Sequence, residues 1–479
     1  MKILCYLEAM NLDNIFRDCQ DLSTIRGGGL SVLNIANPVI ARVSGKAISA
    51  GASQGLFTLE ANSCEKAEEW VRKGLGEIPI LRHTTIMTSA LEYDEQAFSR
   101  QRAELKAMNR WKQMRSASVV YPELLGNEVC GIDRIRPGRR REDLEEKEVQ
   151  SDFTAERRAH GKKEKAALLQ QILGKETVGT LGIVKDLTEL SDGGGKYGNL
   201  DLKVAVLRFD GNSFGNIVKS CSGPKELGEF SVRTRDQQEE FFRRLVATPG
   251  FRNHGWKRGS AGWDKLRLEI LVYGGDEVTF VVPAWLGWEA LHCFYETARE
   301  WPEFGGWPVS YSGGVVFANH KVPIHAVRDL GSALADEAKD RRTRAGLEKG
   351  NLAAYQVLES FDSVGTDVSE FLDSRFGKVG IDGILMGAAT IQLLHEEMSH
   401  LRACVGRRQL HRLARKLVAG EVPKTEKDQA AARKALLEGE NERAIGTLGR
   451  LEALLGWSGY LHLLELWDYA GVDLDRKEK

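Results

Sequence analysis

A glycine pair followed by two carboxylates is the part of this sequence best suited to chemistry. In YGGDEV (273–278), Gly274 and Gly275 precede Asp276 and Glu277, and apolar, strand-like runs lie on both sides of the motif. Glycine accepts positive φ and lets backbone approach a ligand closely. The motif therefore predicts a tight hairpin turn that holds two carboxylates at its tip.

A third carboxylate, Asp210, ends another apolar run, VAVLRFD (204–210). In an antiparallel sheet with this strand beside the hairpin, Asp210 would lie next to Asp276. Clustered carboxylates repel one another, and hard oxygen ligands favour Mg²⁺ or Mn²⁺ as the cation that offsets the repulsion. Such a metal site would activate a ribose hydroxyl and stabilise charge on the α-phosphate of a nucleoside triphosphate.

We therefore expect Asp210, Asp276 and Glu277 to be both catalytic residues and metal ligands. The alternative is a surface turn that binds nothing.

Phosphate-binding groups are expected at two further places. DGNSFGNIV (210–218) opens a helix directly after a strand, so backbone amides in it could meet phosphate at the helix N-terminus; the residues concerned are Gly211, Asn212, Ser213 and Phe214. Lys339, with Arg342 as its helper, lies in the helical stretch LADEAKDRR. Acidic residues alternate with these two cations, so a solvated helix face is the alternative.

The elements around these residues follow the order β, α, β, β, α, β. Hydrophobic periodicity predicts four strands, with helices between them and after the last. The strands are expected at 204–210, 266–273, 278–285 and 309–319, and the helices at 233–248, 285–300 and 325–342. This alternation predicts an α+β fold of ferredoxin-like βαββαβ type.

A weaker copy of the same order occupies the N-terminus. When residue 14 is laid over residue 216, Glu8 falls on Asp210; in a second stretch, aligned separately, GASQ (51–54) falls on GGDE (274–277). Ser53 and Gln54 then replace both hairpin carboxylates. We interpret this as two like-folded units, of which only the second keeps charged metal ligands. Chance similarity between two β-rich stretches is the alternative.

The chain divides into four parts on this reading. We expect a degenerate unit at 1–91, a helical connector at 92–200, the carboxylate-bearing unit at 201–362 and an all-helical domain at 363–479. In the last part, Arg408, Arg412, Arg415 and Lys416 share one face of an amphipathic helix. That face permits contact with a phosphate backbone, and an ordinary solvated helix surface is the alternative.

The composition excludes several classes of protein. A chain of 479 residues with 42% hydrophobic and 28% charged residues is folded, not fibrous or disordered. Its net charge of -1 gives no overall attraction to nucleic acid or membrane, so any such contact is local. The seven cysteines are widely spaced, and no stretch approaches the ~20 apolar residues of a membrane helix. We expect a cytoplasmic protein that does not enter a membrane.

These motifs resemble the large polymerase-cyclase subunit of type III CRISPR effector complexes, whose palm domains are related to GGDEF diguanylate cyclases. The resemblance is carried by VLRFDGNSFG, YGGDEVTF, SYSGGVVFANHKVPIHAV and LADEAK, in that order. It implies an active palm at 201–362, an inactive palm at the N-terminus and a terminal helical domain.

The resemblance also implies a function. Asp210, Asp276 and Glu277 would carry the metals, Gly274 and Gly275 would shape the nucleotide pocket, and Lys339 would hold phosphate. The implied reaction joins ATP through 3′-5′ bonds into a cyclic oligonucleotide messenger of antiviral defence. The implied partners are guide or target RNA and other CRISPR effector subunits, and a homodimer is left open.

This sequence departs from the family pattern in three ways. Glu277 stands where the family usually has a second Asp, no His-Asp dipeptide occurs, and the connector keeps a single cysteine, Cys130. We therefore expect neither the family's HD nuclease nor a structural zinc, since one thiolate cannot close a tetrahedral site. Two other functions stay open: a non-catalytic scaffold that binds nucleotide and RNA, and a cyclase that makes a mononucleotide or dinucleotide signal.

Overall fold

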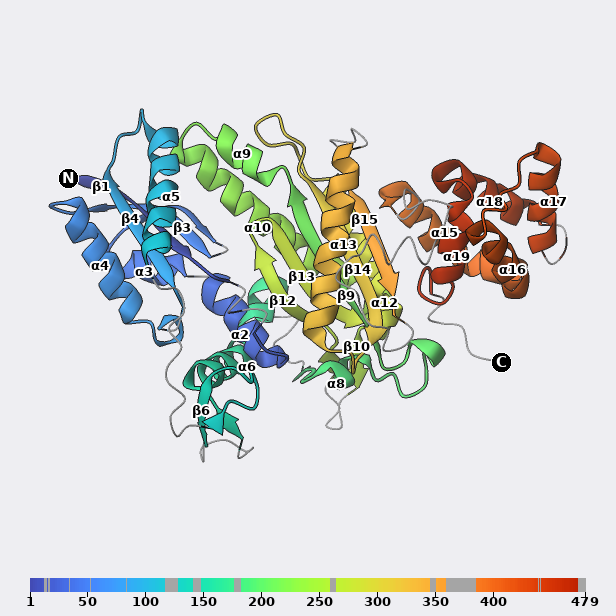
Figure 1. The fold of residues 1–479 in the computed structure, drawn as a ribbon, viewed down its shortest axis with the longest axis horizontal. Coiled ribbons are helices and arrows are strands. Elements are labelled where there is room, and N and C mark those ends of the chain that lie inside the picture. Colours follow the sequence, from blue (N-terminus) through green and yellow to red (C-terminus); the bar gives the residue numbers. More distant parts are fainter. Residues whose placement is uncertain are drawn as a thin grey trace.

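The computed structural model contains two α+β units, a connector and a helical domain (Figure 1). It describes residues 1–472 apart from 13, 14, 16, 17, 34, 52, 83, 117–127, 141–147, 176–181, 259–263, 345–349, 359–384, 438 and 440. The first unit and the helical domain lie at opposite ends, with the second unit between them (Figure 1). Within the described residues, no helix combines the length and apolar character needed to span a bilayer.

The first unit is a four-stranded antiparallel sheet in the order β2-β3-β1-β4. Its elements are β1 (Lys2–Ala9), α2 (Leu22–Leu33), α3 (Ala36–Arg42), β2 (Lys46–Gly51), β3 (Gln54–Glu60), α4 (Cys64–Gly76) and β4 (Ile86–Glu92). The following helix α5 (Phe98–Arg115) packs on β4 and β1. We expected this helix in the connector; in the structure its Phe98 and Leu105 are buried in a cluster with Leu4 and Tyr6 of β1.

The second unit repeats this arrangement and extends it. Its sheet runs β12-β13-β9-β14-β15-β16, so its first four strands match the order of the first unit. The elements are β9 (Lys203–Asn212), α9 (Phe214–Ser220), α10 (Pro224–Ala247), β12 (Glu269–Gly274), β13 (Glu277–Pro283), α12 (Ala284–Arg299), β14 (Ser310–Asn319), α13 (Ile324–Arg344) and β15 (Leu352–Val357). The predicted α+β fold with two ferredoxin-like units is confirmed.

The strand registers show how closely the two units correspond. Glu8 pairs with Gln54 across β1 and β3, just as Asp210 pairs with Glu277 across β9 and β13. Both hairpins also contain a bulge, between Ala47 and Ser49 in one unit and between Ile270 and Val272 in the other. These are equivalent positions in the sequence overlay. A shared bulge in a shared register is a feature of one fold built twice.

Several predicted boundaries need correction. The strand expected at 266–273 is two strands, because β11 (Asp264–Leu266) pairs with β10 (Trp256–Arg258) and β8 (Gly182–Ile183) before β12 begins. Helix α10 starts nine residues before the expected position, at Pro224, a residue that suits the first helical turn. The predicted limit at 362 lies outside the described residues, and β16 (Met386–Gly387) still pairs with β15 of the second unit.

The connector contains a three-stranded sheet and the long helix α6 (Asp152–Leu173). Its strands are β5 (Glu128–Val129), β6 (Pro137–Arg140) and β7 (Val149–Gln150). The carboxylate of Asp133 organises the turn before β6: it accepts hydrogen bonds from the backbone of Arg136 at 2.9 Å and from the hydroxyl of Ser151 at 3.2 Å. Burial raises the pKa of Asp133, but the hydrogen bonds from the Arg136 backbone and the Thr154 hydroxyl outweigh burial, so the pKa is lowered.

The helical domain has five helices after β16 among the residues that the structure describes. They are α15 (Ala388–Cys404), α16 (Arg407–Val418), α17 (Glu426–Leu436), α18 (Glu442–Leu455) and α19 (Ser458–Glu465). Helix α15 packs on α12 of the second unit, so the core of the helical domain is continuous with that of the sheet.

The first unit and the connector are joined to the second unit through a buried ion cluster on β12. The carboxylate of Glu269 accepts Arg26 Nε of α2 at 2.6 Å and Lys165 Nζ of α6 at 2.5 Å. Helices α2 and α6 cross closely because glycines face each other: a Cβ on Gly27 would lie 1.8 Å from the carbonyl oxygen of Arg157. The cluster fixes the strand that leads to the glycine hairpin.

We predict that Glu269→Gln destabilises the protein strongly. The amide would leave two buried cations without a counter-ion, which typically costs about 3 to 5 kcal/mol. The pKa of Glu269 is lowered by Lys165 and Arg26 against the effect of burial, so its contribution is present above the unfolded-state pKa and is lost as pH falls through the folded-state pKa. Urea unfolding measures the loss.

Glu240→Gln is the matched control. Glu240 pairs with Arg243 and Arg244 on the solvent-facing side of α10, where an ion pair contributes at most about 1 kcal/mol. Equal unfolding midpoints for the two variants would contradict the role given to the buried cluster.

Candidate active site

The glycine hairpin has the geometry that the sequence predicts. Strands β12 and β13 are joined by Gly275 and Asp276, and Gly274 and Gly275 have φ of 113° and 62°. Residues with side chains are strained at such φ values. The turn therefore depends on both glycines, and it places Asp276 directly before the first residue of β13.

Gln238 of α10 forms two hydrogen bonds with the backbone of this turn. Its side-chain Oε1 accepts a hydrogen bond from Gly274 N at 2.8 Å, and its Nε2 donates to Gly275 O at 3.0 Å. The Gln238 side chain is fully buried. The Gln238 amide thus forms hydrogen bonds with the Gly274 N–H and the Gly275 carbonyl group of the turn. These two bonds fix the turn against α10.

Asp210 and Glu277 lie directly opposite each other on β9 and β13. Opposite residues of an antiparallel pair point to the same face of the sheet, so the two carboxylates are neighbours. Each also contacts a cation: Asp210 forms an ion pair with Lys339 of α13, and Glu277 with Arg208, which lies two residues before Asp210 on the same face of β9.

Asp276 lies beside these two pairs. Its carbonyl oxygen accepts a hydrogen bond from Gly211 N at 2.7 Å, which ties the turn to the end of β9. Burial of the carboxylate in the recess around the turn raises the pKa of Asp276, and the neighbouring Asp210 and Glu277 raise it further. The residue is nevertheless open to solvent.

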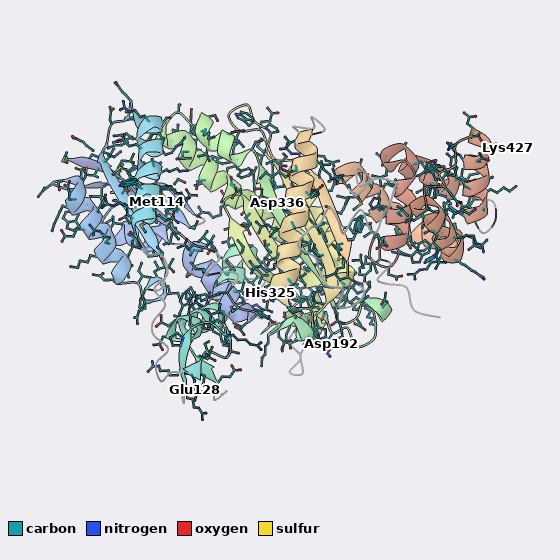
Figure 2. All side chains as sticks on the ribbon, in the orientation of Figure 1. Met114, Glu128, Asp192, His325, Asp336 and Lys427 are labelled. Carbon is teal, nitrogen blue, oxygen red and sulfur yellow. The ribbon has the colours of Figure 1, made fainter. Side chains whose placement is uncertain are left out.

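Asp336 adds a fourth carboxylate on α13, whose position is labelled in Figure 2. Burial and then the charge of Asp210 raise the pKa of Asp336. Asp210 thus raises the pKa of two acidic residues, Asp276 on the hairpin and Asp336 on α13.

The carboxylates suit a dication by donor type and charge, but the structure pairs two of them with cations instead. Within the described residues, no three Asp, Glu, His or Cys side chains are arranged as a ready set of metal ligands. The pKa of Asp276 is raised first by burial and then by the neighbouring carboxylates of Asp210 and Glu277. A bound dication would relieve the repulsion among these carboxylates, provided that Lys339 and Arg208 give up Asp210 and Glu277.

The strand-to-helix turn after Asp210 is less suited to phosphate than we expected. The side-chain amide of Asn212 is buried within hydrogen-bond distance of the Ser310 and Ser312 hydroxyls, at 3.2 and 2.8 Å. Ser213 has φ of 60°, and α9 has only seven residues. Phe214 packs on Tyr311, and Gly211 gives its ring room, since a Cβ there would lie 2.4 Å from it.

The Asn212 side chain is therefore structural, and only Phe214 of the four predicted residues lines the cavity described next. Of the two predicted cations on α13, Lys339 reaches Asp210 and lies 3.3 Å from the carbonyl oxygen of Gly211. Arg342, one turn further along, is buried.

A cavity of about 540 Å³ lies between the two α+β units, beside the hairpin. Gly274, Gly275 and Asp276 form one wall, and residues of β2, β3 and α5 of the first unit form another. Its charged lining consists of four cations and one carboxylate: Arg102, Lys106, Lys219, Arg235 and Asp276. Arg102 is buried, and its Nη1 has no hydrogen-bond partner among the described residues. The cavity therefore fits an anionic ligand.

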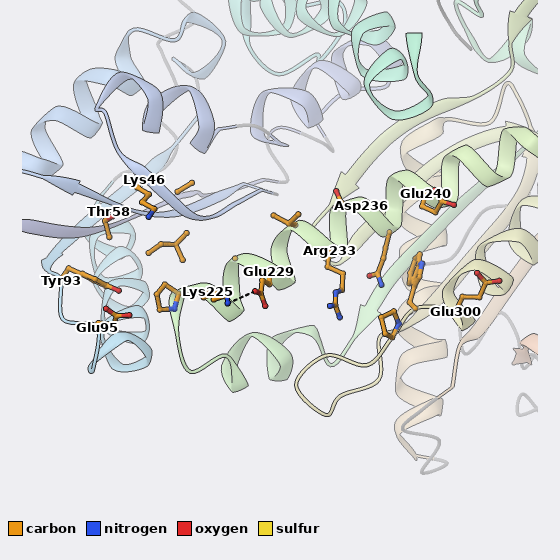
Figure 3. A pocket seen from close by; sticks show the side chains of 18 of the residues that line it. Lys46, Thr58, Tyr93, Glu95, Lys225, Glu229, Arg233, Asp236, Glu240 and Glu300 are labelled. Atoms are coloured by element: carbon orange, nitrogen blue, oxygen red, sulfur yellow. Dashed lines mark ion pairs between the residues drawn. The ribbon is translucent and has the colours of Figure 1, made fainter. Parts of the chain in front are cut away.

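A larger groove of about 1090 Å³ runs along the other side of α10 (Figure 3). It contains none of the predicted site residues, and its lining carries both signs of charge. Several of its cations are already paired, as Lys225 is with Glu229 and Arg244 with Glu300. This groove is less suited to a polyanion than the cavity beside the hairpin.

Sequence reasoning missed Gln238, Arg208 and the cations of α5. Two signals were present. Gln238 is a polar residue on the apolar face of an amphipathic helix, and Arg208 lies at i−2 from Asp210 and so shares its strand face. The contribution of α5 had no local signal, because it depends on how the two units pack together.

Comparison with known proteins agrees with the resemblance of the motifs. Residues 203–348 match the family profile described as Cas10/Cmr2, second palm domain. This part of the chain is similar to that palm domain. The expected resemblance to the palm-containing subunit of type III CRISPR complexes is thereby confirmed, and the chain is Cas10-like. It matches none of the curated proteins.

Solved structures share the fold of the whole chain. The Csm1-Csm4 cassette in complex with pppApApA matches with a TM-score of 0.54 and 11% identity over 98% of this chain and 69% of that one. Csm1 from T. onnurineus matches with a TM-score of 0.52 and 13% identity over 98% and 70%. The Csm1-Csm4 cassette in complex with AMPPNP matches with a TM-score of 0.52 and 11% identity over 97% and 70%. The likeness therefore covers both α+β units and the helical domain.

We predict that Asp210→Asn lowers the pKa of Asp276 in the Cas10-like palm. The substitution removes the negative charge that raises this pKa most, so the ionised form of Asp276 becomes easier to reach. Lys339→Met should raise the same pKa, because Lys339 stabilises the ionised carboxylate. Carboxyl-carbon NMR titration with labelled aspartate measures both shifts, and an unchanged pKa in Asp210→Asn would contradict the proximity of the two carboxylates.

Proposed function

We propose that this protein is a Mg²⁺-dependent nucleotidyltransferase that converts ATP into a 3′-5′ linked cyclic oligonucleotide, acting in CRISPR-type antiviral defence. The observation that carries the proposal is the direct opposition of Asp210 and Glu277 across two strands, with Asp276 beside them at the wall of a cationic cavity.

Each part of a nucleoside triphosphate finds a group of matching chemistry in this arrangement. The cavity beside the hairpin has room for a nucleotide-sized ligand, and Arg102, Lys106, Lys219 and Arg235 offer positive charge to its phosphates. The glycine turn lets a ligand approach backbone without side-chain obstruction. Lys339 belongs to α13, and its ammonium group lies beside the end of β9, where it can contact a phosphate oxygen.

Asp210, Asp276 and Glu277 are the residues that would hold Mg²⁺ or Mn²⁺. A bound dication would lower the pKa of a ribose 3′-hydroxyl and stabilise the charge that develops on the pyrophosphate leaving group. The protein's own contribution is positional: β9 and β13 fix two carboxylates in register, while Gln238 fixes the turn that carries the third.

The relatives' complexes point to the same class of ligand. Solved Csm1-Csm4 cassettes are described with AMPPNP, an ATP analogue, and with the linear oligoadenylate pppApApA. We extend this class of ligand, and the association with other CRISPR effector subunits and guide or target RNA, to the present chain. A cytoplasmic location accords with that role.

A second function is favoured by one observation. Lys339 and Arg208 already neutralise Asp210 and Glu277, so these two carboxylates have counter-ions without a metal. In a scaffold subunit that binds nucleotide and RNA without turnover, these two ion pairs would stay intact when the nucleotide binds. The experiment below separates the two functions.

We predict that purified protein incubated with ATP and Mg²⁺ releases pyrophosphate, and that Asp210→Asn lowers turnover by about 10²-fold or more, as expected when a charged group at the reacting phosphates is lost. Liquid chromatography with mass spectrometry identifies the product and separates a cyclic oligonucleotide from a mononucleotide or dinucleotide. Each reaction is run with and without RNA.

Glu8→Gln is the matched control, because Glu8 holds the position of Asp210 in the first unit but faces Gln54. It should leave turnover unchanged. Absence of pyrophosphate under all conditions, together with nucleotide binding that survives Asp276→Ala, would favour the scaffold.

We also predict that Gln238→Ala lowers kcat by about tenfold while the protein stays folded. Loss of the clamp frees the glycine turn, and small displacements of a catalytic group have large kinetic effects. Gln237→Ala is the control, because Gln237 lines the groove on the other side of α10. An unchanged kcat in Gln238→Ala would show that β12 and β13 alone position Asp276. Circular dichroism verifies folding.

A further inference from the structure

Helix α16 of the helical domain is far more basic than the chain as a whole. It has five cations in 12 residues, Arg407, Arg408, Arg412, Arg415 and Lys416, and no carboxylate. The whole chain has a net charge of -1. Positive charge is therefore concentrated on this helix, which plays no part in the palm.

The cations are ordered along one face. Arg408, Arg412 and Lys416 follow one another at i, i+4 and i+8, which spaces them by about 6 Å along the axis. Arg415 and His411 flank this row. Arg408, His411, Arg412, Arg415 and Lys416 are all exposed. Leu410, Ala414 and Leu417, on the opposite face of the helix, are buried. We call Arg408, Arg412, Arg415 and Lys416 the basic row.

The basic row is not used within the described part of the protein. Arg407, just outside the row, forms an ion pair with Asp468 at 3.1 Å. Among the described residues, no carboxylate forms an ion pair with Arg408, Arg412 or Arg415. Like charges at i,i+4 destabilise a helix, so the arrangement is unfavourable unless an external anion offsets it.

The chemistry of the basic row favours a phosphate backbone over a protein partner. Guanidinium groups bind phosphate in bidentate geometry. Protein interfaces usually have an apolar centre, and none of the exposed large hydrophobic residues in the described chain lies on α16. The row is narrow and linear, so it follows a single strand better than it covers a duplex.

We propose that the basic row on α16 binds the phosphate backbone of single-stranded RNA. The helical domain lies at the end of the molecule away from the first unit, and Lys427 on α17 marks this end (Figure 2). The surface is therefore distinct from the nucleotide cavity between the two units. The inference deepens the proposed function, because it assigns the proposed RNA partner to a surface, and it does not depend on turnover of ATP.

The test is salt-dependent binding of the full chain to a labelled oligouridine of about 16 nucleotides, within the size range of single-strand binding sites. Fluorescence anisotropy compares the wild type with the triple variant Arg408→Gln, Arg412→Gln, Arg415→Gln. We expect at least about tenfold weaker binding at low salt. The slope of log K against log salt should become shallower by about 2, since three phosphate contacts contribute about 0.7 each for single strands.

The matched control is the triple variant Lys66→Gln, Arg72→Gln, Lys73→Gln on α4. These cations are also exposed, and the change in net charge is the same, but Glu65, Glu68 and Glu69 alternate with them. We expect binding within about twofold of the wild type, as for loss of diffuse charge alone. Circular dichroism of both variants verifies that they fold.

Three outcomes would overturn the proposal: no binding of oligouridine by the wild type at low salt, equal losses in both triple variants, or complete displacement of the RNA by excess ATP. The last would place the RNA in the cavity between the units. None of them bears on pyrophosphate release by the palm, so the two proposals fail separately.

Discussion

The structure of the palm depends on two carboxylates that face each other across neighbouring strands. Asp210 and Glu277 would repel in a bare antiparallel pair. Arg208 and Lys339 make their proximity tolerable, one from the same strand and one from α13. The more distant features serve this arrangement: Gln238 fixes the turn, and the buried cluster on Glu269 anchors the strand that leads to it.

The first unit has the same fold but lacks the pair of opposed carboxylates. It keeps the register and the bulge, but Gln54 faces Glu8, and Glu8 pairs with Arg110 of α5 at 3.0 Å. A single carboxylate with its own cation has little to offer a metal. The unit instead provides one wall of the cationic cavity, including Arg102 and Lys106. Under the proposed function, the degenerate copy thus contributes to the nucleotide site and is not merely a remnant.

Sequence alone was sufficient where the physics is local. Apolar periodicity and two glycines predicted the hairpin, and the overlay of Glu8 on Asp210 predicted a repeat that the strand registers reproduce. It failed where tertiary contacts decide. The Asn212 side chain, for example, lies within hydrogen-bond distance of two serines of β14, about a hundred residues away, and no local pattern indicates that contact. The place of α5 likewise follows from packing that no local pattern reveals.

The ion pair between Lys339 and Asp210 would also couple phosphate binding to the charge of the carboxylates. Lys339 is the counter-ion of Asp210, so a phosphate group that binds this ammonium competes with the carboxylate for it. Loss of the pair leaves Asp210 uncompensated beside Asp276, whose pKa is already raised by burial and by its acidic neighbours. A cation then becomes more favourable there than in the nucleotide-free protein. Nucleotide and metal are thus expected to favour each other's binding, because both act on one shared ion pair.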